Sequence, residues 1–137
     1  MASYRIWGDK KEKKVILDSS AIMMPFEFSI DLEDELTRLL GRYHIFIPTA
    51  VISEIEFLSK YGKGRKKNIA TASLKLIGRY DSIDSEGSGD DAVFNLAKKM
   101  QGIVVTNDKE LRKRLVKISI PTIFLRAKKQ LAMDPIT

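Results

Sequence analysis

The chain of 137 residues contains no cysteine and only one histidine, His44. Without cysteine, disulfide bonds are excluded, and so is any zinc or iron–sulfur site that needs thiolate ligands. A single histidine excludes a histidine-rich metal site and argues against a catalytic triad built on histidine. Any metal ion held by this protein would therefore have oxygen ligands.

Long apolar runs are also missing. None approaches the roughly 20 residues that a membrane helix needs, and the opening stretch MASYRIWGDKKEKK contains no apolar segment typical of a signal peptide. We therefore expect a cytoplasmic protein with no membrane partner. The first expected turn lacks G-x-G-x-x-G and G-x-x-x-x-G-K-[ST], and it lacks the acidic pair of receiver domains. These absences argue against a nucleotide-binding or phospho-receiver domain.

Positive charge is concentrated in the last third of the chain. The formal net charge is +6, but residues 98–129 hold ten Lys or Arg against two acids, whereas residues 1–57 hold seven against ten. Nucleic acid is the natural partner for this asymmetry, because basic side chains that neutralise phosphates release counterions. A solvated charged face is the alternative explanation, and composition alone does not decide between the two.

Short apolar runs alternate with longer amphipathic segments along the chain. Strands separated by such helices imply right-handed crossovers and a mostly parallel sheet covered on both faces. We therefore expect an α/β fold, a three-layer α/β/α sandwich around a mostly parallel sheet of about five strands. The expected strands are 14–18, 43–48, 80–84, 103–106 and 121–125; the expected helices are 31–42, 49–62, 66–79, 90–102 and 108–118, with YGKGRKKN as a loop before the third.

The length suits one domain with a core of ordinary size. We expect a charged lead at residues 1–13, the folded domain at 14–126 and a C-terminal tail at 127–137. In parallel sheets of this kind, ligands gather beyond the carboxyl ends of the strands. The side chains expected at that edge are therefore the candidates for a functional site.

Two aspartates follow expected strands. Asp18 ends the first strand and Asp108 lies two residues beyond Thr106, the last residue of another. A parallel sheet would bring both carboxylates to one edge. Each aspartate could also simply cap the turn or helix that follows it.

Glu54 shares a helical stripe with Val51, Ile55 and Leu58, whereas Glu56 lies nearly opposite. The spacing therefore predicts that Glu54 faces the sheet, near the same edge. A carboxylate in that position costs free energy unless it is paired or bound to a cation. A salt bridge to a nearby Lys or Arg is the alternative to a metal-binding role.

A further acidic pair, Asp90 and Asp91, opens an expected helix after Gly89. Asp90 lies on the flank of that helix's apolar stripe, whereas Asp91 points away from it, so the spacing prefers Asp90 as the inward group. Both also suit the positive end of a helix dipole. The choice between them stays open by one residue.

Four carboxylates gathered near one strand edge would raise each other's pKa unless cations bind among them. Oxygen ligands alone point to Mg²⁺ or Mn²⁺. Such a site can prepare a water for in-line attack on a phosphodiester and stabilise the leaving oxygen.

Four motifs in this order resemble those of the PIN-domain nucleases, and the resemblance covers about residues 14–126. They are LDSSAI (17–22), PTAVISEIEFL (48–58), GDDAVFNLAKK (89–99) and TNDKELRKRL (106–115). MPFEF after the first motif and the fourth motif look most like the branch that contains the archaeal and eukaryotic processing endonucleases of small-subunit ribosomal RNA. Toxins of VapC type are the next comparison.

The resemblance implies an endoribonuclease that uses Mg²⁺ or Mn²⁺ to hydrolyse single-stranded or loop RNA, in ribosomal RNA processing. A VapC-type toxin and a non-cleaving RNA-binding module of ribosome assembly are the alternatives. Implied partners besides RNA are a second copy of the chain and either a ribosomal precursor particle or an antitoxin.

The resemblance also implies roles for individual residues. Asp18, Glu54, Asp90 and Asp108 would be catalytic and hold metal, with Asp91 as the other candidate ligand, and Ser20, Thr106 and Asn107 would orient ligands or waters. Candidate RNA contacts are Lys63, Arg65, Lys66, Lys67, Arg112, Lys113, Arg114 and Lys117.

Overall fold

A computed structural model describes residues 12–134. Most of the expected lead at residues 1–13, and the last three residues of the expected tail, lie outside this range. In chain order the elements are β1 (Lys13–Leu17), α2 (Ser19–Phe28), α3 (Leu32–Leu40), β2 (Tyr43–Pro48), α4 (Thr49–Tyr61), α5 (Gly64–Ile77), β3 (Asp81–Ile83), α6 (Asp90–Met100), β4 (Ile103–Val105), α7 (Lys109–Lys117), β5 (Thr122–Arg126) and β6 (Gln130–Met133).

One mixed sheet organises the described residues, with strand order β3-β2-β1-β4-β5-β6. The first five strands run parallel, and β6 pairs antiparallel with β5. The expected α/β architecture with a mostly parallel sheet is therefore confirmed. The sixth strand lies beyond residue 126 and was not predicted.

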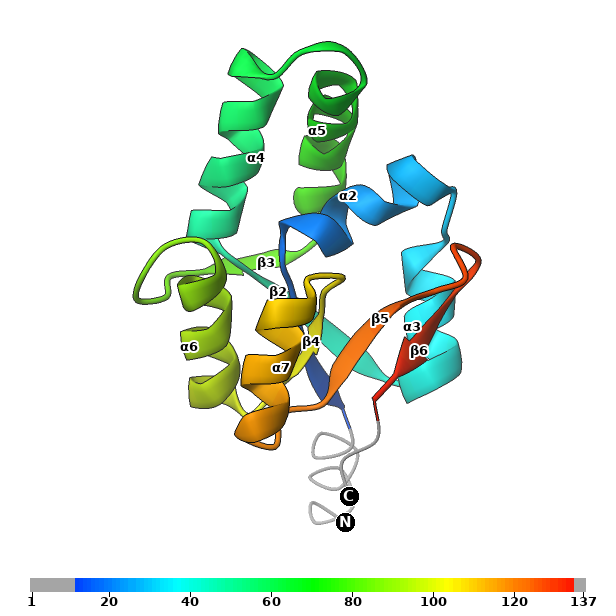
Figure 1. Cartoon of the computed structure of the whole chain (residues 1–137), viewed down its shortest axis with the longest axis vertical. Helices are drawn as coiled ribbons and strands as arrows, with labels where there is room; N and C mark the ends of the chain where they lie inside the picture. Colours follow the sequence, from blue (N-terminus) through cyan, green and yellow to red (C-terminus); the bar gives the residue numbers. More distant parts are fainter. Residues whose placement is uncertain (1–11, 135–137) are drawn as a thin grey trace, which may run out of the picture.

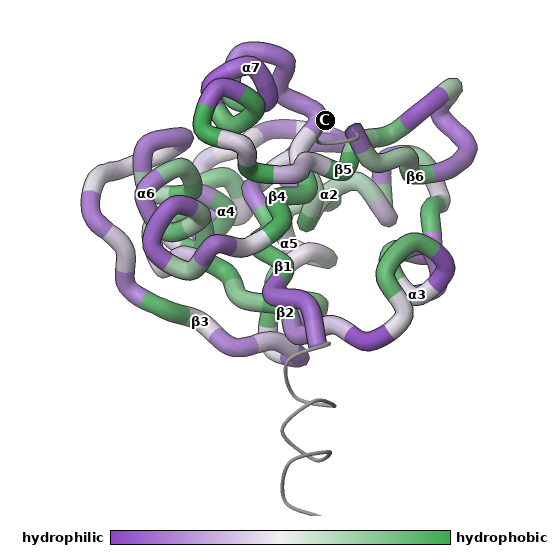
Figure 2. The backbone as a smooth tube through the Cα atoms, turned by 90° about the horizontal axis from the view of Figure 1, so that it is seen from below, coloured by the Kyte–Doolittle hydropathy of each residue, from purple (hydrophilic) through white to green (hydrophobic). Residues whose placement is uncertain are grey.

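Helices cover both faces of the sheet. Seen from below, α6 and α7 lie on one side of the strands and α3 on the other (Figure 2). The α4–α5 pair projects beyond the carboxyl ends of the strands, at the top of Figure 1, where α2 also lies. The chain adds β2 and β3 on one side of β1 and then returns through α6 to β4 on its other side.

The core is built around the two central strands. Val15, Ile16 and Leu17 of β1 and Val104 and Val105 of β4 are fully buried, as expected for strands covered on both faces. They pair in parallel register, so that Leu17 lies opposite Val105. The residues that follow these two strands therefore emerge side by side at the same edge.

This edge is also where the strand order reverses. From β1 the chain moves outward through β2 and β3, whereas from β4 it moves the other way through β5. The segments that follow β1 and β4 therefore lead toward opposite ends of the strand order. In open α/β sheets, such switch points are where ligands bind.

One helix was not predicted, and one local expectation was wrong. A helix, α2, occupies residues 19–28 although Pro25 lies inside it; proline lacks the amide hydrogen that a helix interior needs, so the sequence pattern did not indicate a helix. The basic stretch YGKGRKKN is not a loop throughout, because α5 begins at Gly64. By contrast, the helix expected at residues 31–42 is confirmed as α3, with Asp31 as its N-cap and Gly41 as its C-cap.

Among the described residues, no helix combines the length and the apolar composition that crossing a membrane would require.

Candidate active site at the carboxyl edge of the sheet

Asp18 lies at the centre of the edge, directly after β1, and is 5% exposed. Its Oδ1 accepts hydrogen bonds from Ser20 Oγ (2.7 Å) and from the Ala21 amide (2.9 Å), which caps α2. Its Oδ2 accepts a hydrogen bond from Thr106 Oγ1. Burial nevertheless raises the pKa of Asp18, because these three donors do not compensate for the loss of water and the nearby Asp108 charge adds to the rise.

Thr106 and Ser20 join the two strand ends. Besides donating to Asp18, the Thr106 hydroxyl accepts from the Asp108 amide (3.0 Å), and Ser20 Oγ accepts from the Asn107 amide (3.1 Å). The side-chain oxygen of Asn107 in turn accepts from the Leu125 amide (2.8 Å), which ties the loop to β5. Ser20 and Thr106 therefore contact Asp18 directly, and Asn107 holds the loop that carries Asp108.

Asp108 caps α7 and also faces the other aspartates. Its Oδ1 accepts from the Glu110 amide (2.9 Å) and the Leu111 amide (3.2 Å). Asp108 also lies near enough to Asp90, at the start of α6, to affect its titration. Partial loss of hydration, the interaction with Asp108 and the charges of Asp108 and Asp18 raise the pKa of Asp90 to about 6, against the opposing effect of Arg114.

The structure separates the neighbouring pair Asp90 and Asp91. Asp90 interacts with Asp108 and Asp18, whose charges help to raise its pKa. Asp91 instead forms an ion pair with Arg114 (3.0 Å) and its side chain is 64% exposed. The geometry therefore favours Asp90 over Asp91 as the group that acts together with Asp18 and Asp108.

Glu54 differs from its expected environment. Val51 and Ile55 of the same helix are buried, but Glu54 is exposed. The buried side of α4 is centred between Val51 and Ile55, so Glu54 lies at the margin of the stripe and not within it. Because α4 starts directly after β2, the neighbour of β1, Glu54 still belongs to the same end of the sheet.

Within residues 12–134, no three Asp, Glu or His side chains converge closely enough to hold a metal ion as they stand. The donor set nevertheless suits a hard divalent cation, because Asp18 and Asp108 keep lone pairs beyond those used by protein donors. Burial is the largest cause of the raised pKa values of Asp18 and Asp90, the charge of Asp108 adds to both, and Arg114 opposes the rise only at Asp90. A cation would relieve this repulsion.

Comparison with known proteins identifies the family of the chain. The family model described as a PIN-like domain matches residues 15–128. The chain belongs to the PIN-like domain family. The expected resemblance to PIN-domain ribonucleases is thereby confirmed.

Two archaeal members of the family are similar to the chain along most of its length. It is 31% identical to Ribonuclease VapC4 of Methanocaldococcus jannaschii, over 85% of this chain and 92% of that protein. It is 27% identical to Ribonuclease VapC9 of Archaeoglobus fulgidus, over 92% and 93% of the two chains. Among solved structures, the PIN domain endonuclease Utp24 superposes with a TM-score of 0.73 at 25% identity, covering 90% of this chain and 92% of that one.

Several of the basic residues expected to contact RNA are used within this PIN domain. Arg112 is paired with Asp134 (2.9 Å), which also accepts from Thr122 Oγ1 (2.9 Å), and its guanidinium lies 3.7 Å from the centre of the Phe124 ring. This partly buried position anchors α7 to β5, so the expectation that Arg112 contacts RNA is not supported. Arg114 similarly covers Phe94 (4.4 Å) and pairs with Asp91.

The remaining basic residues are more accessible. Lys113 and Lys117 are exposed along α7, the helix that starts at Asp108. Arg65, Lys66 and Lys67 are exposed in the first turn of α5, and Lys63 caps that helix without a side-chain hydrogen bond. Positive charge thus lies on two sides of the aspartates, on α7 and at the far end of the α4–α5 pair.

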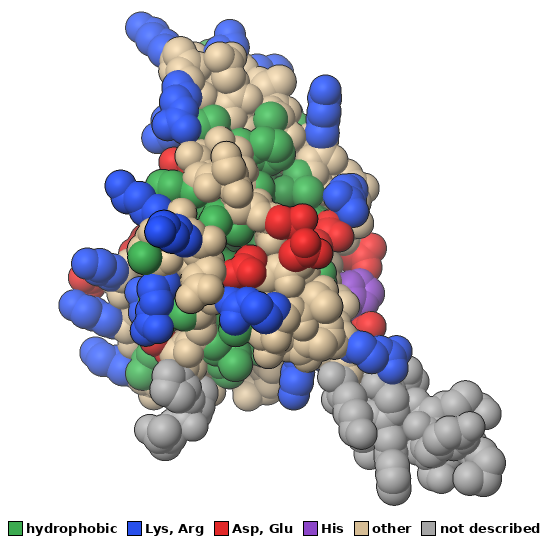
Figure 3. Space-filling model, turned by 90° about the vertical axis from the view of Figure 1, so that its right-hand side faces the viewer, with side chains coloured by type: hydrophobic (Ala, Val, Ile, Leu, Met, Phe, Trp, Pro, Cys, Tyr) green, Lys and Arg blue, Asp and Glu red, His purple; other side chains and the backbone are tan. Residues whose placement is uncertain are grey.

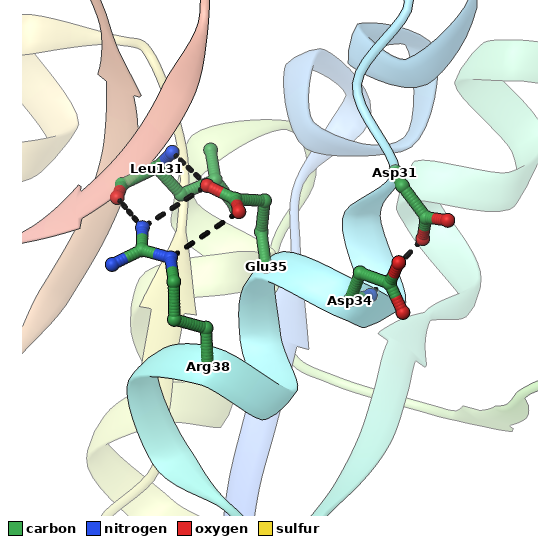
Figure 4. Close-up of polar contacts among 5 residues, drawn as sticks. All are labelled: Asp31, Asp34, Glu35, Arg38 and Leu131. Carbon is green, nitrogen blue, oxygen red and sulfur yellow. Dashed lines mark hydrogen bonds and ion pairs between the residues drawn. The ribbon is translucent and has the colours of Figure 1, made fainter.

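A second acidic region lies on α3, where Figure 3 shows acidic side chains gathered on one face. Glu35 accepts from Arg38 (3.0 Å) and from the Leu131 amide (2.7 Å), as Figure 4 shows. Glu33 pairs with Arg79 (3.0 Å) and accepts from the Tyr80 hydroxyl (2.6 Å). The Arg38 and Leu131 donors lower the pKa of Glu35. The negative charges of Glu35 and Glu33 are therefore balanced by Arg38 and Arg79 within the protein.

Proposed function

We propose that this PIN domain is a metal-dependent endoribonuclease that hydrolyses phosphodiester bonds of RNA at the carboxyl edge of its sheet. The observation that carries the proposal is that Asp18, Asp90 and Asp108, from three separate chain segments, lie at the switch point near enough to affect one another's pKa. Two of these carboxyl groups have raised pKa values that the cationic side chains of the described residues do not offset. The ribonucleases among the relatives support the same activity.

The polar residues of the edge would prepare a rigid cation site. Thr106, Ser20 and the Ala21 amide fix both oxygens of Asp18. The amides of Glu110 and Leu111 both donate to Oδ1 of Asp108, so its other oxygen is not used by these two donors. Asp18, Asp90 and Asp108, with Glu54 from α4, would hold Mg²⁺ or Mn²⁺. When bound, such an ion lowers the pKa of a water and balances the charge that develops on the phosphate.

The basic surfaces would hold the RNA on either side of these acids. Lys113 and Lys117 on α7, and Lys63, Arg65, Lys66 and Lys67 at the end of the α4–α5 pair, can neutralise phosphates. We expect affinity for RNA to fall steeply with salt, and we expect Arg112→Ala to change stability more than affinity.

Removal of the metal tests the activity itself. Purified protein, incubated with a labelled single-stranded RNA in Mn²⁺ or Mg²⁺, should cut internally and leave 5′-phosphate and 3′-hydroxyl ends. EDTA should stop the reaction, and excess Mn²⁺ should restore it. Cleavage that continues in EDTA would contradict the metal mechanism, and binding of RNA without cleavage in any metal would favour a non-cleaving RNA-binding module.

We propose ribosomal RNA as the substrate. Two observations support this: the fourth motif, TNDKELRKRL, resembles that of the small-subunit processing branch, and the fold is similar to the endonuclease Utp24. The physiological protein partner would then be a ribosomal precursor particle. Cleavage of precursor rRNA at one position, in preference to unrelated RNA of equal length, is the expected result.

A toxin is the second candidate, because the two curated relatives are VapC ribonucleases. A toxin would require an antitoxin that blocks the edge. Induced expression of the wild-type chain distinguishes the two functions. A toxin should arrest growth, and the arrest should disappear in Asp108→Asn and on co-expression of a neighbouring small gene. A processing enzyme should leave growth unaffected and cleave precursor rRNA.

A further inference from the structure

Two aromatic side chains on α4 are exposed without an evident role in folding. Phe57 is 60% and Tyr61 is 67% exposed, and their ring centres lie 4.9 Å apart. Exposed rings cost free energy in water, since each could bury a large apolar area. Neither residue has a function that the sequence motifs predict.

The position of the pair links it to the proposed catalytic edge. Glu54, Phe57 and Tyr61 are separated by three and four residues, so they follow one another along one face of α4. At 1.5 Å per residue, Phe57 lies roughly 4.5 Å and Tyr61 roughly 10 Å beyond Glu54 along the helix axis. In Figure 1 the α4–α5 pair extends away from the sheet, so this face leads outward from the edge.

The basic residues near Phe57 and Tyr61 in the sequence indicate the chemistry of a ligand that would cover the two rings. Residues 57–69 contain five basic residues, Lys60, Lys63, Arg65, Lys66 and Lys67, and no acid. Three of them lie in the first turn of α5, where the helix dipole disfavours positive charge and no acid is present. An anionic ligand with flat apolar groups fits such a surface better than an apolar protein face does. Nucleic acid with unstacked bases has this chemistry.

We propose that Phe57 and Tyr61 form a stacking platform for unpaired nucleobases, and that the basic end of the α4–α5 pair holds the adjoining phosphates. The platform rests on the proposed ribonuclease function and defines its substrate as single-stranded, because a duplex keeps its base faces covered. RNA would run along α4 from the tip to the aspartates.

Binding measured in EDTA tests the platform separately from cleavage. The probe is a fluorescein-labelled single-stranded RNA of mixed sequence, compared with the same strand in a duplex, by fluorescence anisotropy. Phe57→Ala and Tyr61→Ala should each weaken single-strand binding roughly tenfold. Phe57→Trp should retain binding, and Phe26→Ala, which removes an exposed ring (40%) from α2, should leave it unchanged.

Salt dependence distinguishes stacking from charge. The slope of log Kd against log salt should stay the same in Phe57→Ala and Tyr61→Ala, because neither ring carries charge. In Lys66→Ala/Lys67→Ala the slope should fall by about 0.7 for each phosphate that the variant no longer neutralises. Circular dichroism should show that all variants remain folded.

Three results would overturn the platform. Unchanged single-strand binding in both alanine variants excludes stacking while leaving the nuclease proposal intact if the wild type still cleaves RNA. A change in sedimentation without a change in RNA binding would identify the rings as a protein contact. A wild type that binds no RNA would reject both the platform and the proposed function.

Discussion

Two regions of this small domain are rich in acids, and they differ in how their charge is balanced. On α3, Glu33 and Glu35 are paired with Arg79, Arg38, a tyrosine hydroxyl and a backbone amide. At the carboxyl edge of the sheet, Asp18 and Asp90 lie near the charge of Asp108, and the pKa values of Asp18 and Asp90 are raised. Glu33 and Glu35 on α3 contribute to the fold through these pairs, whereas we propose that the acids at the edge bind a cation. The number of acids in a region therefore does not identify a candidate cation site. The better indicator is a group of acids that few cationic side chains pair with.

The largest expected effect comes from removing an aspartate charge at the edge. Asp18→Asn and Asp108→Asn should lower cleavage by at least about a hundredfold, because loss of residues that merely orient metal ligands already costs 10–100-fold. The single-turnover rate with Mn²⁺ is the measurement. Asp34→Asn, the matched change on α3, should have no effect. Equal losses in all three variants would show that the two acidic regions do not differ as described.

A pair of buried threonines gives a finer test. Thr106 donates to Asp18 at the edge, and Thr122 donates to Asp134 beside α7; both side chains are fully buried. Thr106→Val and Thr122→Val should each destabilise the fold by about 1–3 kcal/mol in urea. Only Thr106→Val should also lower the cleavage rate, by about 10–100-fold. Normal activity in Thr106→Val would remove the proposed role of this hydroxyl.

Glu35 should matter for stability alone. Glu35→Ala leaves the Leu131 amide and Arg38 without their acceptor, and it should lower the free energy of unfolding by about 1 kcal/mol, because the site is partly exposed. Urea denaturation measures this change, and the cleavage rate serves as the control. A large loss of activity at unchanged stability would assign α3 a catalytic or substrate-binding role.

The pH dependence of stability should have opposite signs in the two regions. The lowered pKa of Glu35 gives stability that is present above its unfolded value of 4.5 and is lost as the pH falls through the folded value. The raised pKa of Asp90, about 6, gives the reverse: its penalty is absent below 3.8 and develops as the pH rises to about 6.

In EDTA at pH 7, Asp90→Asn should therefore stabilise the protein. The gain should be on the order of 1 kcal/mol, less than the full pKa shift implies because Asp90 is exposed to solvent. The gain should vanish at pH 4, and added Mn²⁺ should reverse the order by stabilising the wild type. If the free energy of unfolding of Asp90→Asn equals that of the wild type from pH 4 to pH 7, the proposed repulsion between Asp90 and the other edge aspartates is disproved.

The sequence predicted the parts of this structure that depend on local pattern. Spacing and parallel pairing predict the apolar strands and the position of Asp18 and Asp108 at one edge. The same pattern also predicts that both aspartates cap the helices that follow them. The resemblance to a family placed Ser20 and Thr106 beside them.

Features that depend on distant partners could not be predicted. The four-residue strand β6 is held by Glu35, 96 residues away, and its own pattern is too short to indicate a strand. Arg112 looks like its basic neighbours on α7 until Asp134 and Phe124 enclose it. Glu54 was predicted to face the sheet from its spacing alone, but it is exposed. Its exposure depends on how α4 packs against other elements, which the local pattern does not specify.

The edge aspartates should bind a divalent cation that the α3 acids do not bind. Calorimetric titration of Mn²⁺ into the metal-free protein measures this difference, with Asp90→Asn, Asp91→Asn and Asp34→Asn compared with the wild type. We predict binding by the wild type, Asp91→Asn and Asp34→Asn, and binding at least about tenfold weaker in Asp90→Asn. Equal affinity in all four proteins, or weaker binding only in Asp34→Asn, would refute the assignment of the cation site to the edge.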